Sequence, residues 1–439
     1  MSKPINGFSK LSKRAKREWL AEAFFDADEQ ILAKLKSFDH DEASVQKLFD
    51  GFSENTVCNF YLPFGVAPNM VVNGDTYCVP MVTEESSVVA AASAAAKFWS
   101  TRGGIKAAVS STQKIGQVHF MWAGDVASVR ENWGEIKAKL IADSDNLTES
   151  MRKRGGGITE VELLDLTHIE PNYLQLRVFF ETCDAMGANF INTVLEQMGR
   201  CLTTLAISHP AFASEKHLTV VMAILSNYTP NCVVRAWVDC PIADLTGIPD
   251  LKPEQFAEKF ETAVRIACLD PYRAVTHNKG IFNGIDAVVI ATGNDFRAVE
   301  ACGHAYAARD GQYRSLSKCR VEDGHFYLEL EVALALGAVG GLTALHPMAK
   351  FSLDLLGKPT AKTLMMIAAA TGLAQNFSAV RSLVSTGIQK GHMKMHLHNI
   401  LQTFFVTDDE YEEAFRYFEN HVVSFSAVRE YLETVREEA

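Results

Sequence analysis

The spacing of apolar residues along the chain predicts alternating strands and helices. Residues 70–80 (MVVNGDTYCVP) hold two runs of β-branched and aromatic residues around Asn73-Gly74-Asp75, which predicts a β-hairpin. A strand-like run also extends from Glu54 to Phe64. Residues 88–99 (VVAAASAAAKFW) are almost uncharged and long enough to form a buried helix.

Residues 101–220 differ from the preceding segment in their pattern of apolar residues. Strands are predicted at 118–122 and 173–180, and helices at 132–142 and 190–205, an order that indicates a small α/β insertion. The elements predicted after it are strands at 222–227, 232–237 and 327–336 and helices at 253–266, 360–370 and 376–383.

The stretch 271–297 (PYRAVTHNKGIFNGIDAVVIATGNDFR) is the richest in chemistry. Gly280 and Gly284 predict a glycine turn, and the apolar run 287–291 predicts a short buried strand. A turn at 292–295 then leads into a helix that runs to Arg309. In this interpretation Lys279 and Asp295 converge across the strand end, which suggests a cation that stabilises an electrophile and is tuned by a neighbouring acid.

Two further segments suggest chemistry. Glu84 and Glu85 precede the helix at 88–99; one is expected to cap the helix dipole, and the other to be buried, with a raised pKa suited to carrying a proton. The run Met186-Gly187-Ala188-Asn189 opens a helix after a strand, which indicates either a phosphate cradle or a simple capped helix. The chain contains no GxGxxG motif.

Residues 386–398 (TGIQKGHMKMHLH) combine a glycine hinge with three histidines. Metal binding is disfavoured, because no carboxylate stands at HExxH spacing and Lys390 and Lys394 would repel a cation. A single histidine on a mobile lid, acting as a general acid, is favoured over three exposed helix histidines.

Composition narrows the class of protein. The 439 residues carry a net charge of −11, which argues against a nucleic-acid-binding surface. The nine cysteines are scattered without a CxxC pair, as expected for reduced thiols. The basic N-terminal segment has no apolar core typical of a signal peptide, and the most apolar run, 332–345, is too short to cross a bilayer. We therefore expect a soluble, cytoplasmic protein without membrane contact.

Together these motifs resemble 3-hydroxy-3-methylglutaryl-CoA (HMG-CoA) reductase of the soluble bacterial type, over residues 8–425. The matching segments are Glu54-Asn55, Pro80–Ser87, Arg154–Gly157, Asp184–Asn189, Ile224–Asn227, Asp270–Gly284, Gly293–Asp295, Leu373–Asn376 and Gly387–His392.

The resemblance implies an α+β fold: a large mixed α/β substrate-binding domain, an inserted small ferredoxin-like α/β cofactor domain, and a mobile helical C-terminal lid. The large domain would comprise residues 1–111 and 220–385, the cofactor domain 112–219 and the lid 386–439. It also implies a homodimer, or a higher oligomer, with active sites shared between chains.

The implied reaction is the four-electron reduction of HMG-CoA to mevalonate and CoA by two hydride transfers from NAD(P)H, without a metal. Lys279 would stabilise the oxyanion with Asp295 holding it, Glu85 would pass a proton, and His392 would protonate the CoA thiolate. The substrate would be bound by Arg273, Ser87, Asn283 and Lys10, and the cofactor by Asp184, Met186, Gly187, Ala188, Asn189 and Asn227.

The choice of cofactor depends on the segment before Gly155. Relatives that use NADH place an aspartate at the position of Thr148, whereas here Arg152, Lys153 and Arg154 follow closely. The missing carboxylate and the nearby cations favour the 2′-phosphate of NADPH, with NADH possible.

Two other functions stay open on the sequence. The chain could be a catalytically inactive CoA- or nucleotide-binding homologue, although the simultaneous presence of all four catalytic candidates argues against this. It could also be an acyl-CoA transferase or hydrolase with Cys302 or Cys183 as nucleophile, but no convincing Cys/His pair supports that function.

Overall fold

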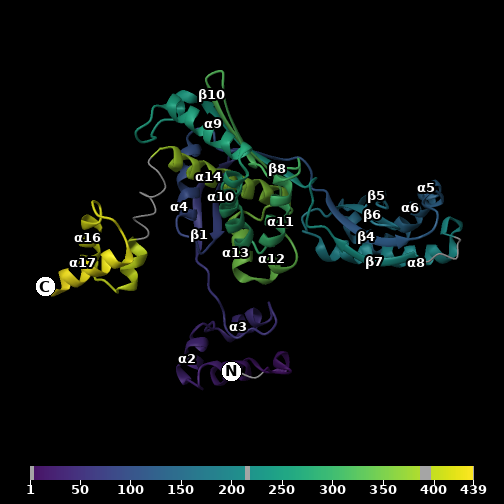
Figure 1. Ribbon diagram of the computed structural model, residues 1–439, viewed down its shortest axis with the longest axis horizontal. Coiled ribbons are helices and arrows are strands. Elements are labelled where there is room, and N and C mark those ends of the chain that lie inside the picture. The colour runs from purple at the N-terminus through teal and green to yellow at the C-terminus, as the bar shows by residue number, and fades with distance from the viewer. Residues whose placement is uncertain (1–3, 213–217, 386–396, 439) are drawn as a thin grey trace. The chain divides into compact units, whose positions relative to one another are not determined.

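The computed structural model describes residues 4–212, 218–385 and 397–438, which form two compact units, residues 1–63 and 64–439 (Figure 1). The sequence predicts a large domain that includes the first of these units, whereas residues 1–63 form a compact unit of their own. This unit contains the short turn η1 (Phe8–Lys10) and the helices α1 (Lys13–Phe24), α2 (Glu29–Ser37) and α3 (Ala43–Asp50).

Ion pairs hold the helices of the first unit together. Lys13 Nζ lies 2.8 Å from Asp39 and 2.7 Å from Asp50, and Arg17 contacts Asp39 at 2.6 Å. Two of the N-terminal basic residues are therefore neutralised within the unit. The strand predicted from Glu54 is wrong, since residues 51–63 form turns and loop and the first strand begins at Phe64.

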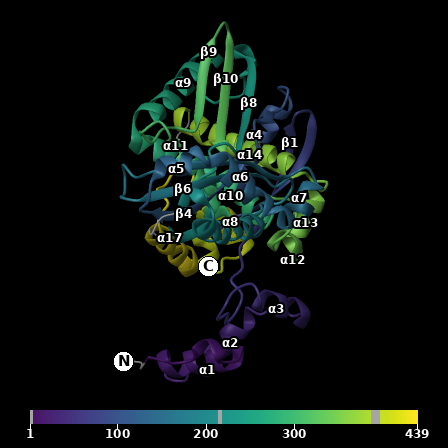
Figure 2. The same cartoon turned by 90° about the vertical axis from the view of Figure 1, so that its right-hand side faces the viewer.

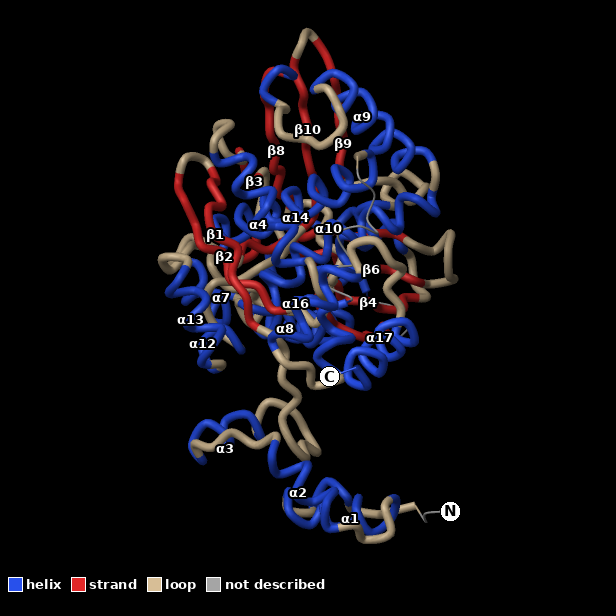
Figure 3. The backbone as a smooth tube through the Cα atoms, turned by 90° about the vertical axis from the view of Figure 1, so that its left-hand side faces the viewer, coloured by secondary structure: helices blue, strands red, loops and turns tan. Residues whose placement is uncertain are grey.

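The predicted hairpin is confirmed as β1 (Phe64–Val72) and β2 (Asp75–Val82). Asn73 and Gly74 connect the strands with φ of 53° and 93°, the left-handed geometry of the tight hairpin turn that Asn-Gly favours. The predicted buried helix is α4 (Val88–Ser100), which packs against β1 (Figure 3). Its alanines allow this close packing, and Trp99 is only 1% exposed.

The large core is built on an antiparallel sheet in the order β3-β8-β10-β9. Figure 2 shows β8, β10 and β9 of this sheet side by side. Its strands are β3 (Lys106–Val109), β8 (Val233–Pro241), β9 (Ser317–Glu322) and β10 (His325–Ala333). Helices α9 (Pro253–Leu269) and α14 (Ala361–Val384) pack against it. The buried residues of this core lie between Ala67 and Ala107 and from Cys232 onwards, so the chain leaves the core and later returns to it.

The intervening segment forms a second antiparallel sheet, in the order β5-β6-β4-β7, with a hydrophobic core of its own between Val118 and Phe212. Its strands are β4 (Lys114–Trp122), β5 (Gly157–Asp165), β6 (Tyr173–Glu181) and β7 (Leu218–Leu225). Its helices are α5 (Val126–Glu131), α6 (Trp133–Ala142), α7 (Asp145–Arg152) and α8 (Ala188–Ser208). The strands and helices predicted here are confirmed.

The backbone predicted for 271–291 is wrong, whereas the predicted turn at 292–295 and the helix after it are confirmed. Pro271–Ala291 is one continuous helix, α10, followed by α11 (Phe296–Ala307), so neither the glycine turn nor the strand exists. A Cβ on Gly284 would lie 2.7 Å from the carbonyl oxygen of Thr371 in α14. Gly284 therefore allows α10 and α14 to pack closely. Glycine is used for such close contacts as well as for turns.

Helix α14 is also a single element where two helices were predicted. Among the described helices it is the one long and apolar enough to span a membrane, but 83% of its apolar window is buried, as in a core helix. The remaining described helices are α12 (Leu342–Leu345), α13 (Pro347–Leu355), α16 (Asp408–Tyr417) and α17 (Phe425–Glu438). The last two belong to a third hydrophobic core, between Leu397 and Leu432.

Candidate active site

A lysine and a glutamate that are 194 residues apart in the sequence meet at the surface of the large core. Lys279 Nζ on α10 lies 2.5 Å from Oε2 of Glu85, which precedes α4. The two side chains are 56% and 43% exposed, so the expectation of a buried Glu85 is wrong. The pair is accessible to a ligand, and each side chain retains polar atoms that can face it.

The residue at the start of α4 has an unusual backbone. Ser87 is the N-cap with φ of 72°, and its side chain makes no capping hydrogen bond. A non-glycine residue in this region is strained, and such strain gathers at functional sites. The Ser87 hydroxyl is thus held two residues from Glu85 without a capping role.

Two further predicted substrate residues lie on α10 with Lys279. Asn283 follows one turn later on the same helical face. Arg273 is half-buried, and burial lowers its pKa. Among the described residues its guanidinium has no ion pair with a carboxylate, which leaves its planar fork of donors available for an external carboxylate.

Asp295 is not where the sequence placed it. Its carboxylate caps α11 by accepting from the amides of Arg297 and Ala298, and it lies 3.2 Å from the Arg297 Nε. Burial acts to raise the pKa of Asp295, but the Arg297 side chain and the backbone amides outweigh it and hold the pKa below its usual value. No Lys279–Asp295 contact is found in the described part of the chain.

A buried histidine ties α10 to its neighbours below the site. His277 Nε2 lies 2.6 Å from Ser317 Oγ on β9 and 3.0 Å from Asn376 Nδ2 on α14. Burial, helped by the charge of Arg273, lowers the His277 pKa to about 3. The ring is therefore neutral near pH 7, so it supports α10 and cannot serve there as an acid.

The predicted cofactor residues gather around the start of α8. Gly187 is its N-cap with φ of 90°, and no side chain caps the helix, so its first amides are available to an anion. Met186, Ala188 and Asn227 line one small cavity, together with Lys114 and Cys302. Asp184 is already engaged: it accepts from the amide of Ala361 at 2.7 Å and so caps α14.

Two of the three basic residues that precede Gly155 form ion pairs with carboxylates. Arg152 lies 2.8 Å from Asp145 and Lys153 lies 2.7 Å from Glu149, whereas the Arg154 Nε donates to the carbonyl of Ser150. Thr148 is 3% exposed. Arg154 is thus the cation of the three that has no carboxylate partner among the described residues.

The structure does not relate two of the predicted residues to this site. Lys10 lies exposed in the first compact unit. His392 lies outside the described residues. Sequence reasoning in turn did not single out Lys114, a polar residue at the start of a strand that alternation alone does not mark as buried.

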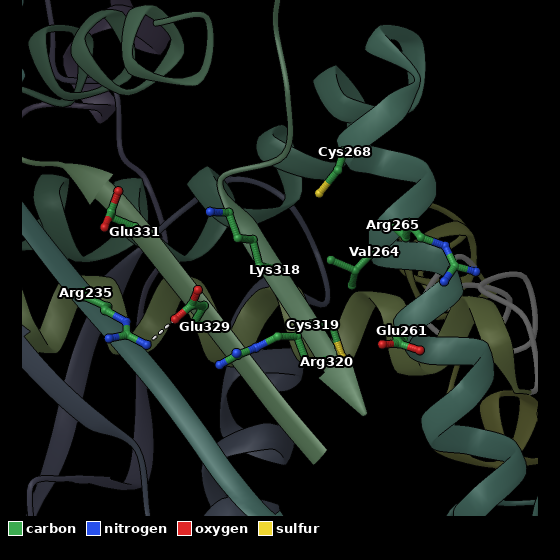
Figure 4. Close-up of a pocket in the computed structure, with 10 residues that line it drawn as sticks. All are labelled: Arg235, Glu261, Val264, Arg265, Cys268, Lys318, Cys319, Arg320, Glu329 and Glu331. Carbon is green, nitrogen blue, oxygen red and sulfur yellow. Dashed lines mark hydrogen bonds and ion pairs between the residues drawn. The ribbon is translucent and has the colours of Figure 1, made fainter. Parts of the chain in front are cut away.

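A cavity of about 590 Å³ is lined by residues of the large core that the sequence did not single out as site residues. It is bounded by α9, β9 and neighbouring strands, and Figure 4 shows its charged lining, with Arg235 paired to Glu329. None of the predicted site residues that the structure describes lines it, so this cavity is not assigned to the candidate site.

Comparisons with known proteins extend over nearly the whole chain. A family model described as hydroxymethylglutaryl-coenzyme A reductase matches residues 12–397. The 3-hydroxy-3-methylglutaryl-coenzyme A reductase of Archaeoglobus fulgidus is 35% identical over 93% of this chain and 89% of its own length. A probable reductase of the same name from Borreliella burgdorferi is 31% identical over 90% and 88% of the two chains.

Solved structures from Streptococcus pneumoniae give the same result. One HMG-CoA reductase structure covers 98% of this chain and 99% of its own, with a TM-score of 0.72 and 38% identity. Another, of the class II enzyme bound to NADPH in open conformations, covers 87% and 99%, with a TM-score of 0.71 and 40% identity.

Proposed function

This chain belongs to the hydroxymethylglutaryl-coenzyme A reductase family, class II, and from that premise we propose which of its residues carry the reaction. The protein is an oxidoreductase that reduces HMG-CoA, a step of the mevalonate pathway. The bound nicotinamide cofactor supplies the hydride for each of the two reductions. The observation that carries the proposed site is the contact between Lys279 and Glu85.

Lys279 is the group that stabilises negative charge on the thioester oxygen. Its ammonium is held by α10 and by Glu85 before substrate arrives, and a donor fixed in advance need not reorganise as charge develops. Glu85, in contact with the ammonium, passes the proton to the oxygen of the intermediate carbonyl. The sequence predicts Asp295 as the partner of Lys279, and in this proposal Glu85 is that partner. Asp295 stays a predicted catalytic residue because it stands in a family motif.

The substrate's free carboxylate is assigned to Arg273, whose half-buried guanidinium lacks a carboxylate partner among the residues described. Ser87 and Asn283 bind its other polar groups, and Lys10 meets CoA. His392 protonates the CoA thiolate from the C-terminal lid, residues 386–439. CoA leaves between the two reductions, and the aldehyde intermediate must then be kept away from water. A lid that opens and closes serves both steps.

NADPH is the proposed cofactor, with NADH also accepted. The uncapped start of α8 and the residues Asp184, Met186, Gly187, Ala188, Asn189 and Asn227 would hold it. Arg154 is the available cation for a 2′-phosphate. A homologous structure carries NADPH, which supports this choice.

The domain division proposed for this function is a cofactor domain at 112–219, a large domain at 1–111 and 220–385, and the lid. Separate hydrophobic cores at Val118–Phe212 and Leu397–Leu432 support it. We further propose a cytoplasmic homodimer whose active sites are shared between chains.

Loss of nicotinamide absorbance with HMG-CoA, measured with NADPH and NADH in parallel, tests the proposal. We expect turnover with preference for NADPH; no oxidation of either cofactor would favour an inactive homologue. Lys279→Ala should lower kcat about 100- to 1,000-fold, the usual effect of losing one oxyanion donor, without changing the Kd for NADPH. Lys259→Ala, an exposed lysine on α9, is the control, and a near-normal rate for Lys279→Ala would refute the oxyanion assignment.

A further inference from the structure

A buried lysine lies directly beneath the proposed cofactor loop, residues 184–189. Lys114 is the first residue of β4 and is only 4% exposed. Its Nζ donates to Thr182 Oγ1 at 2.6 Å, and Thr182 is itself fully buried. An ammonium has three N–H donors, so this single bond does not exhaust it.

No carboxylate pairs with this ammonium in the part of the chain that the structure describes. The two acids close in the sequence to Thr182 have other partners. Glu181 accepts from the Thr112 hydroxyl and from the amide of Cys183, and Asp184 accepts from the amide of Ala361. Lys114 is therefore a buried cation without a counter-charge bonded to it.

Water offers little compensation for that charge. The cavity that Lys114 lines has about 30 Å³, roughly the space of one water molecule. An unpaired buried charge is among the costly features of a fold. The other residues around the cavity include Met186, Ala188 and Asn227, so the positive charge is placed beside the segment expected to receive an anionic ligand.

Lys114 also bears on the shape of that segment. Thr182 passes the hydrogen bond on, since its hydroxyl donates to the carbonyl of Ala185 at 2.7 Å. A Cβ on Gly187 would lie 2.5 Å from Thr182 Cγ2, so the loop closes tightly over the threonine. The ammonium, the hydroxyl and the loop backbone form one connected chain of contacts.

We propose that Lys114 is a positioning residue for the phosphate-bearing dinucleotide cofactor, supplying a buried positive charge beneath the 184–189 loop and holding that loop through Thr182. In this role Lys114 acts through its charge and through its hydrogen bond to Thr182 and not by direct contact with the cofactor. The inference rests on the proposed function only in locating the cofactor at this loop.

The proposed role of Lys114 predicts different effects on the affinity for NADPH and on the stability of the fold. Lys114→Met keeps the length of the side chain and removes its charge. A structural role predicts that this variant unfolds at a lower temperature. The electrostatic role predicts the opposite for the protein without cofactor, because an apolar side chain of similar size no longer buries an unpaired charge.

The experiment measures NADPH binding to the full chain by fluorescence without HMG-CoA, and thermal unfolding without cofactor. Lys114→Met should raise the Kd for NADPH at least ten-fold, with an unchanged or higher unfolding temperature and an unchanged KM for HMG-CoA. Thr182→Val, which keeps the charge and removes the bond to Ala185, should raise the Kd by less. Lys139→Met, on α6 and 56% exposed, is the control and should change neither quantity.

An unchanged Kd for Lys114→Met would overturn the inference, and so would a weaker Kd accompanied by a lower unfolding temperature. The wild-type assay keeps this separate from the function itself. Failure of the wild type to oxidise either cofactor with HMG-CoA refutes the function, whereas an active wild type beside an unaffected Lys114→Met refutes only the role of Lys114.

Discussion

At the scale of single residues, the least expected group is the carboxyl of Asp286 on α10. One of its oxygens, Oδ1, is buried and has no hydrogen-bond partner among the described residues. Burial raises the pKa of Asp286, and the charge of Glu300 on α11 and a hydrogen bond to it act in the same direction. Two carboxyls in one partly buried site favour a state in which they share a proton.

This arrangement predicts a pH dependence of stability. The folded protein keeps the Asp286 proton at pH values where the unfolded chain, with an ordinary pKa of about 3.9, has released it. Folding then takes up a proton, so this group lowers stability progressively as the pH rises above about 4. Asp286→Asn cannot titrate, and relative to the wild type it should gain stability between about pH 5 and pH 9, by roughly 1 kcal/mol or more.

Thermal or urea unfolding across that range measures the difference. Asp310→Asn, an exposed carboxylate, is the matched control and should run parallel to the wild type. A constant offset between Asp286→Asn and the wild type at all pH values would contradict a proton held by Asp286.

The sequence allowed the candidates to be named but not their partners. Lys279, Glu85 and Asp295 all stand in motifs that a reader of the sequence can find. Which acid meets Lys279 depends on how α10 packs against the segment before α4, a contact between residues 194 positions apart. Glu85 was expected to be buried because it adjoins an uncharged helix, yet it precedes the N-cap and remains in contact with solvent.

At the scale of elements, the crossing of α10 and α14 decides the shape of the large core. Gly284 and Gly372 face the opposite helix, where a Cβ would come within 2.7 Å of Thr371 O or of Ile285 Cγ1. Gly280, one turn earlier on α10, differs: a Cβ there meets no described atom within 4 Å. The two glycines of α10 are thus a matched pair with opposite environments.

Alanine substitution should therefore change stability in opposite directions. Gly284→Ala forces a backbone contact apart and should lower the free energy of unfolding by about 1–3 kcal/mol. Gly280→Ala should raise it by up to about 1 kcal/mol, because alanine is the better helix former and space is open. Urea unfolding measures both, and equal effects of the two variants would contradict the assigned crossing.

Helices and strands could be predicted where the local sequence is compatible with only one kind of structure. Asn73-Gly74 between two β-branched runs leads to a hairpin and little else, and that hairpin is present. In 271–297 the same reasoning failed, because Gly280 and Gly284 suit a turn and a close helix contact equally well. The short apolar run 287–291 likewise fits a strand or a buried helix, and only packing against α14 distinguishes them.

At the scale of the whole molecule, the third hydrophobic core and the large one consist of different residues from different parts of the chain. No buried residue of the third core, Leu397–Leu432, belongs to the large core, whose last member is Val380. The pair Lys279–Glu85 and the 184–189 loop belong to structure that precedes Ser385. The segment after Ser385 can therefore be removed without taking away residues that the other cores bury.

Removal of residues 386–439 should consequently separate chemistry from folding. The truncated chain should keep the unfolding temperature of its main transition and its Kd for NADPH, since the cores and the cofactor loop remain. It should lose turnover of HMG-CoA, because it lacks His392 and the proposed lid. Full-length His392→Ala, which keeps the segment and removes one imidazole, should lose turnover as well. Near-normal turnover by the truncated chain would show that protonation of the thiolate comes from elsewhere. A large fall in its unfolding temperature would instead mean that the third core stabilises the large one.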